Sequence, residues 1–155
     1  MKKVQASLVV IAAAALLAPA LASPADRQGV RLVAKMTPKE VVTPSNKAWS
    51  APASLKGAQG NLTAKLSPDG RRLTWKLSYA NLGRTALVIA DIHVGKSGQF
   101  GPILVRLCGP CKPGQHGVKS LKAGSLATFK SGNTWATLIT NKYPNGVVRG
   151  QIHGR

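Results

Sequence analysis

Alternation of apolar and polar residues is the dominant pattern of this chain, and it predicts short β-strands joined by tight turns. In residues 60–66 every second side chain is apolar, which is typical of a strand with one buried face. Residues 67–70, Ser-Pro-Asp-Gly, have the order of a tight turn, because proline presets φ and glycine accepts a positive φ. The alternation resumes over residues 73–79, so the two segments predict a β-hairpin.

Further segments show the same alternation, or a short apolar run bounded by glycine and proline. Residues 37–60, by contrast, contain several prolines and predict a long irregular connection. No sustained 3.6-residue apolar period follows residue 22, so helices are not expected there. The seven to eight short strand segments predict an all-β antiparallel sandwich or barrel. Residues 135–140 are apolar on both faces, which favours a central position. The further strands predicted are residues 30–36, 88–94, 103–107, 125–130, 135–140 and 147–153.

Residues 1–22 have the pattern of an export signal. Lys2 and Lys3 precede an apolar run over residues 8–18 that is too short to anchor the chain in a bilayer, and Ala-Leu-Ala at residues 20–22 matches a cleavage site. We therefore expect an exported protein, periplasmic or secreted, with residues 23–155 forming a single domain. No later segment is long and apolar enough to predict a transmembrane helix.

Charge adds a second expectation. The chain has 22 Lys and Arg against 4 Asp and Glu, a formal net charge of +18, and loss of Lys2 and Lys3 with the leader leaves +16. Such a charge predicts attraction to an anionic envelope polymer, an anionic lipid surface or an acidic protein, although scattered bases are also typical of a solubilising surface. Few aromatic residues accompany the bases, which argues against specific nucleic-acid binding. The candidate polyanion contacts are Arg71, Arg72, Lys76, Arg106 and Arg149.

Residues 90–111 hold most of the side chains that could carry chemistry. Cys108-Gly109-Pro110-Cys111 has the spacing of a thiol-disulfide oxidoreductase site, in which a helix after the first cysteine lowers the pKa of its thiol. Lys112-Pro113-Gly114 follows, so that helix is not expected here. In an oxidising compartment the two cysteines of the chain instead predict a structural disulfide between Cys108 and Cys111.

A copper or zinc site is the alternative interpretation of the same stretch. Asp91 and His93 lie on the same face of a predicted strand, and Cys108, Cys111 and His116 could complete a ligand set. The spacing matches no standard zinc module. No paired carboxylates or placed nucleophile are visible either, so we expect neither a cofactor nor an enzyme activity.

Four fragments of the chain stand out, at residues 62–70, 92–95, 101–105 and 143–152. Together they resemble the CHRD domain, which is named from chordin and also occurs in exported bacterial single-domain proteins. The resemblance covers about residues 31–153, and it implies a Greek-key β-sandwich similar in arrangement to copper/zinc superoxide dismutase, used mainly as an extracellular module. Many relatives carry His-x-His where this chain has Asp91-Ile92-His93, and a further histidine where it has Ile139.

Together, these observations predict an exported, non-catalytic binding or structural module of the cell envelope or extracellular space, strongly cationic, with an anionic polymer or acidic protein as its partner. The alternative is a small periplasmic protein that binds copper or zinc, or that exchanges disulfides, through Cys108 and Cys111.

Overall fold

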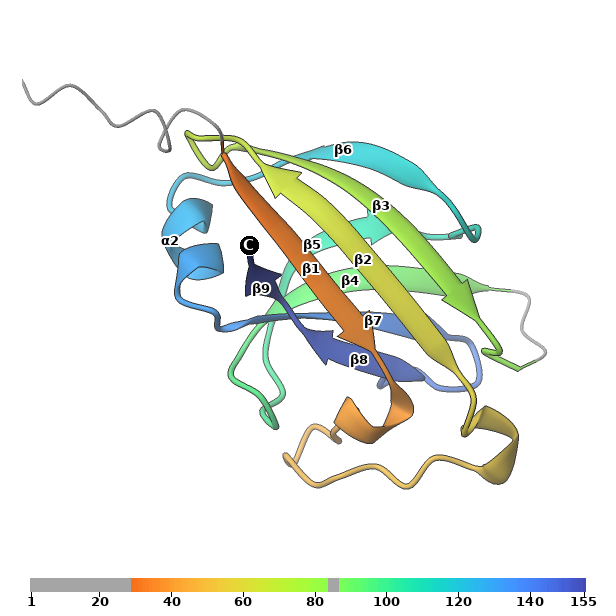
Figure 1. Cartoon of the computed structure of the whole chain (residues 1–155). Helices are drawn as coiled ribbons and strands as arrows, with labels where there is room; N and C mark the ends of the chain where they lie inside the picture. The colour runs from red at the N-terminus through yellow and green to blue at the C-terminus, as the bar shows by residue number, and fades with distance from the viewer. Residues whose placement is uncertain (1–28, 84–86) are drawn as a thin grey trace, which may run out of the picture.

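Two antiparallel β-sheets packed face to face form the body of the computed structural model, which describes residues 29–83 and 87–155 (Figure 1). The five-stranded sheet has the order β6-β3-β2-β1-β9, and the four-stranded sheet has the order β5-β4-β7-β8. The predicted all-β sandwich is thus confirmed, whereas the predicted export signal lies outside the described residues. The elements are β1 (Val30–Met36), β2 (Gln59–Leu66), β3 (Arg72–Ala80), β4 (Val88–Val94), β5 (Ile103–Cys108), β6 (His116–Ser120), α2 (Ser125–Lys130), β7 (Thr134–Thr140), β8 (Val148–Gln151) and β9 (His153–Gly154).

The predicted hairpin is present as β2 and β3. Leu62 pairs with Leu77 and Leu66 with Leu73, so the apolar side chains of both strands point toward the second sheet. The turn closes through a hydrogen bond of 2.9 Å from the Gly70 N–H to the Ser67 carbonyl oxygen, and Gly70 has the positive φ of 69° that the turn requires. Sequence alternation therefore fixes both the register and the buried face of this hairpin.

The connection between β1 and β2 is irregular, as its prolines predict. It contains two short 3-10 helices, Pro38–Glu40 and Ala53–Leu55, and Leu55 enters the hydrophobic core. Figure 1 shows this connection as a long excursion at one end of the sandwich, beyond the ends of β1 and β2.

The order of strands contains Greek-key crossings. After β3 the chain moves to the second sheet and forms β4 and β5, and it then returns to place β6 beside β3. A second crossing places β7 beside β4, and β8 covers the other edge of β7. The predicted central position of residues 135–140 is confirmed, because β7 lies between β4 and β8.

The prediction of a strand at residues 125–130 is wrong, because this segment forms the helix α2. Ser125 and Phe129 are its buried residues, whereas Ala127 between them is exposed. In a strand Ala127 would share the buried face, so the burial follows the period of a helix. Phe129 packs into the core at the end of the sandwich that contains Gly70. Among the described residues no helix, α2 included, has the length and apolar character that a membrane crossing requires.

The edge strand β6 was not predicted from the sequence. Its residues alternate between exposed and half-buried positions without a single fully buried side chain. Gly117 faces inward and lies against the indole ring of Trp75, so the space that an apolar side chain would fill is taken by the neighbouring strand. An apolar alternation is therefore missing from β6 although its backbone pairs with β3.

The predicted last strand, residues 147–153, is divided between the two sheets. β8 pairs with β7 in the four-stranded sheet, and β9 pairs with β1 in the five-stranded sheet. Ile152 lies between them, buried in the core, and its N–H donates to the Thr134 carbonyl oxygen at 2.8 Å. The end of the chain thus joins both sheets.

β8 approaches the backbone of β1 closely at Gly150. A Cβ atom at Gly150 would overlap the Lys35 carbonyl group and the Met36 Cα atom, both of which are backbone. We expect Gly150→Ala to lower the free energy of unfolding by at least about 2 kcal/mol, because the backbone of one sheet must move away from the other. Chemical denaturation measures this change. Gly57→Ala, where a Cβ would make an ordinary contact with Asn81, is the matched control, and an equal effect of both variants would contradict the prediction.

Candidate functional site

The two cysteines are bonded to each other, as the sequence predicts. Cys108 and Cys111 form a disulfide and both residues are buried. The Cys111 N–H donates to the Val88 carbonyl oxygen at 2.7 Å, and the Tyr79 hydroxyl donates to the Cys111 carbonyl oxygen at 2.8 Å. A turn rather than a helix follows Cys111, as expected. The disulfide therefore fixes the end of β5 against β4 and β3, and this turn lacks the helix that activates a redox cysteine.

The predicted metal ligands do not converge. His116 is exposed on the edge strand β6 of one sheet, whereas Asp91 and His93 belong to β4 of the other. Within residues 29–83 and 87–155, no group of three or more His, Cys, Asp or Glu side chains is arranged to hold a metal ion. The sulfur atoms of Cys108 and Cys111 are bonded to each other, so neither is a thiolate that could bind a metal ion.

Asp91 and His93 lie on the face of β4 that points away from the core, but both are buried. Asp91 receives two hydrogen bonds from the Arg106 guanidinium, one of 2.9 Å from Nε and one of 3.1 Å from Nη2. The Arg106 side chain remains 54% exposed while that of Asp91 is fully buried. Arg106, predicted as a polyanion contact, thus neutralises a buried carboxylate of its own chain.

His93 stacks on Trp135 with 4.1 Å between the ring centroids, and the Arg149 guanidinium lies 3.9 Å from the centre of the Trp135 ring. The His93 Nδ1 atom is 2.8 Å from the Gly101 carbonyl oxygen, which can only accept, so Nδ1 carries the proton of the neutral ring. Burial lowers the pKa of His93, while the hydrogen bond to Gly101 opposes that shift. His93 is therefore held as a neutral member of a packed stack.

Arg149 is also part of this stack and is only 3% exposed. Its Nη2 donates to the Lys96 carbonyl oxygen at 3.1 Å, and burial lowers its pKa to about 10, with Glu40 opposing the shift. The side chain stays protonated near neutral pH but is covered by the protein. The structure therefore removes Arg149 from the bases that can contact a partner at the surface.

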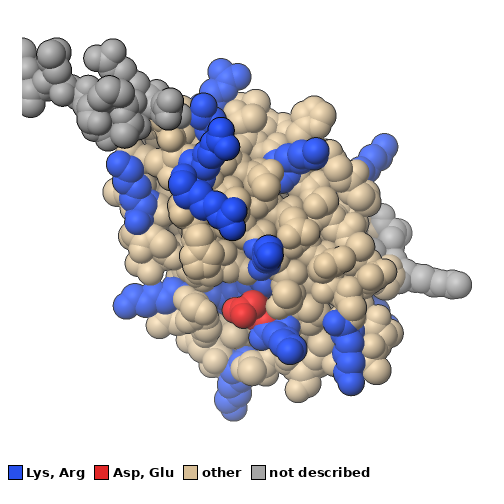
Figure 2. All heavy atoms as spheres, viewed as in Figure 1, with Lys and Arg blue, Asp and Glu red and all other residues tan. Residues whose placement is uncertain are grey.

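A group of exposed bases lies on the outer face of the five-stranded sheet. None of the five strands contains an aspartate or glutamate. Figure 2, which views this face, shows Lys and Arg spread across it and acidic atoms at one place. We call this surface the basic face, and its described bases are Arg31, Lys35, Lys65, Arg72, Lys76 and Arg155.

Two open grooves run along the basic face. One, of about 730 Å³, is lined by Lys35 and Arg155, and the other, of about 500 Å³, is lined by Arg31, Lys65 and Lys76 among others. They share Val33, Thr63 and Arg155 and therefore adjoin each other across β1 and β2. Arg31 lies directly opposite Lys65 in the strand register.

Of the bases predicted from the sequence, the structure brings Arg72 and Lys76 to this face. Arg71 is exposed beside them, in the turn before β3, and its N–H donates to the Asp69 carboxylate at 3.1 Å. Sequence reasoning missed Arg31, Lys65 and Arg155. The first two stand at polar positions of correctly predicted strands, so pairing residues 30–36 with residues 60–66 would have placed them side by side.

The fold is a two-sheet antiparallel β-sandwich. Comparison of the sequence with models of protein families identifies the family within this fold class. The model of the CHRD domain matches residues 32–152. The chain belongs to the CHRD domain family. The comparison with curated proteins found no match, and neither did the comparison with solved structures.

The buried position of His93 predicts a loss of stability in acid. Because burial lowers its pKa, the unfolded chain binds the proton more readily, so the stability given by neutral His93 is complete above about pH 6.5 and falls as the pH decreases toward the folded-state value. Urea denaturation between about pH 7 and about pH 5 should show a smaller pH dependence in His93→Gln than in the native chain. His116→Gln, at an exposed position, is the control; the same reduction in both variants would contradict the assignment to His93.

The disulfide encloses a very short loop, so its removal should cost little. We expect Cys108→Ala/Cys111→Ala to remain folded and to lose about 1 to 2 kcal/mol of unfolding free energy, since a small loop restricts the unfolded chain weakly. Circular dichroism during urea titration measures both points. Thiol titration of the unfolded native protein without reductant should find no free thiol, and two reactive thiols would show that the pair does not form.

Proposed function

We propose that this CHRD domain is a non-catalytic extracellular binding module that holds a linear anionic polymer on its basic face. The observation that carries the proposal is the pairing of Arg31 with Lys65 in a sheet face whose strands contain no acidic residue. Like charges directly opposite in adjacent strands destabilise a sheet. An anionic ligand between them removes this repulsion and gains two charge-assisted contacts.

The shape of the basic face favours a linear polymer over a flat surface. The groove that contains Arg31, Lys65 and Lys76 lets a narrow chain approach all three bases together, and the adjoining groove extends its path past Val33 and Thr63, whereas a lipid surface would reach only the rim. Thr63 and Thr74 stand between these bases and offer hydroxyl groups to an anionic ligand. An envelope polymer that carries phosphate or carboxylate groups has the charge spacing and flexibility to follow such a path.

Binding of fluorescently labelled long-chain polyphosphate tests the proposal. We expect saturable binding whose logarithmic affinity falls linearly with the logarithm of salt concentration, because bound counterions are released. Arg31→Ser/Lys65→Ser should weaken binding by about ten-fold or more and lower the salt slope by about 1 to 2. The matched control is Lys122→Ser/Lys130→Ser, which removes the same charge from exposed positions outside the basic face.

An equal loss of affinity in both double variants would show that net charge alone attracts the polymer. Tighter binding to vesicles that contain phosphatidylglycerol, or to polyglutamate, would identify a lipid surface or an acidic protein as the better partner. The folding stability of Arg31→Ser/Lys65→Ser should not decrease, because the substitution removes a repulsive pair.

A further inference from the structure

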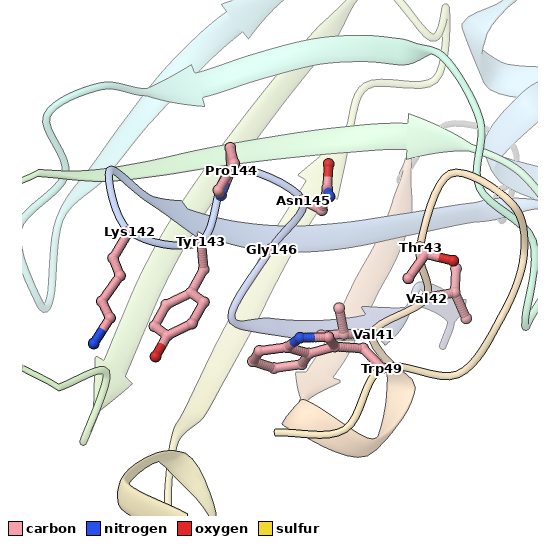
Figure 3. A pocket seen from close by; sticks show the side chains of 9 residues that line it. All are labelled: Val41, Val42, Thr43, Trp49, Lys142, Tyr143, Pro144, Asn145 and Gly146. Carbon is pink, nitrogen blue, oxygen red and sulfur yellow. The ribbon is translucent and has the colours of Figure 1, made fainter. Parts of the chain in front are cut away.

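Trp49 separates two hollows at the end of the sandwich that contains the β1–β2 connection. The smaller hollow, of about 100 Å³, lies between Trp49 and the turn at residues 142–146. Figure 3 shows the Trp49 ring extending toward Tyr143, with Lys142 beside the tyrosine. The larger hollow, of about 290 Å³, is lined by Trp49 together with Pro38, Lys39, Ala51 and Lys56. We call the two hollows together the Trp49 cleft.

The aromatic walls of the cleft are fixed in place. The backbone N–H of Trp49 donates to the Val41 carbonyl oxygen at 3.1 Å, and both Trp49 and Tyr143 pack against the hydrophobic core. Their rings meet edge to face, with 5.5 Å between the centroids and an interplanar angle of 64°. Trp49 is half-buried, in contrast to Trp75 and Trp135, which are 3% and 2% exposed. Trp49 is therefore the most exposed of the three tryptophans, and it lines both hollows while its backbone is anchored.

Lysines surround this aromatic surface. Lys39 and Lys56 line the larger hollow and Lys142 lines the smaller one, with its Nζ 5.5 Å from the centre of the Tyr143 ring. All three are exposed and none makes a salt bridge within the described residues. Glu40, next to Lys39 in the chain, lines the groove of the basic face rather than the cleft. The cleft thus combines an apolar aromatic surface with a positive charge on each side of it.

This combination selects among anionic ligands. An inorganic polyanion has no apolar surface and gains nothing from an indole ring, and a neutral sugar gains nothing from the lysines. A pyranose ring that carries a carboxylate has both parts, because its C–H groups form an apolar face and its carboxylate accepts from an ammonium group. The volumes suit short saccharide units rather than a larger ligand.

We propose that the Trp49 cleft binds a short acidic saccharide, with sugar rings packed against Trp49 and Tyr143 and their carboxylates paired with Lys142 and Lys56. The cleft and the basic face share no lining residue, so this site is separate from the one that carries the proposed function. Because the residues differ, a ligand bound at one site makes none of the contacts of the other. Each site is therefore tested by its own probe and its own variants.

Trigalacturonic acid is the probe for the cleft, and maltotriose is its neutral counterpart. We expect trigalacturonic acid to change the tryptophan fluorescence of the native chain saturably, whereas maltotriose should bind at least about ten-fold more weakly. Lys56→Gln/Lys142→Gln should weaken trigalacturonate binding by about ten-fold, since two charge-assisted contacts are lost. Trp49→Phe, which keeps an aromatic ring in the core contact, should remove the fluorescence change and weaken binding measured by calorimetry.

Lys122→Gln/Lys130→Gln is the control of equal charge change and should leave trigalacturonate binding unaltered. Absence of saturable binding, or equal binding of trigalacturonic acid and maltotriose, would overturn the proposal. Loss of trigalacturonate binding in Arg31→Ser/Lys65→Ser but not in Lys56→Gln/Lys142→Gln would assign the ligand to the basic face and likewise overturn it. Polyphosphate binding is assigned by Arg31→Ser/Lys65→Ser and trigalacturonate binding by Lys56→Gln/Lys142→Gln, so either site can fail without the other.

Discussion

The sharing of the last chain segment between the two sheets is the constraint on which the rest of this sandwich depends. β8 continues the four-stranded sheet, Ile152 fills the core, and β9 continues the five-stranded sheet within a few residues. Two backbone hydrogen bonds between Thr37 and Arg149, of 2.9 and 3.0 Å, hold the crossing where β1 ends. The sheets therefore cannot slide relative to each other without breaking pairs in both.

That crossing also determines how the outer face of the four-stranded sheet is built. Because Arg149 is held by its backbone at the crossing, its guanidinium reaches Trp135, and Trp135 stacks on His93. The loop between β4 and β5 covers this stack with the carbonyl groups of Lys96 and Gly101. A face that could have met solvent is thereby closed by polar contacts. The outward-facing residues of β1, β2 and β3 are by contrast exposed or half-buried.

Sequence patterns predict the fold well where one face of a strand is buried and the other exposed. Residues 30–36 coincide with β1, and Leu62 and Leu77 pair as the alternation indicates. The patterns fail where the inward side chain is missing, as at Gly117, or where a short amphipathic segment fits either period, as at Phe129. Element type in such segments depends on tertiary packing, which local spacing does not contain.

The site residues also divide into those that the local sequence pattern predicts and those that depend on tertiary packing. Cys108 and Cys111 could be paired from their number and the expectation of export, and Arg72 and Lys76 could be placed on an exposed face from their polar positions in a strand. Arg149 could not be assigned correctly, because nothing in a run of Val-Val-Arg-Gly-Gln distinguishes an exposed arginine from one stacked on Trp135. Trp49 and Tyr143 lie far apart in the sequence and meet only through the two loops that carry them.

The disulfide has a consequence for how the chain reaches its native state. The chain contains 2 cysteines, separated by two residues, so intramolecular oxidation has a single possible product. Such a short loop closes readily in an unfolded chain, before either sheet has formed. The bond can therefore be made by any available oxidant without a later isomerisation step, and folding of the sandwich need not wait for a correct choice among partners.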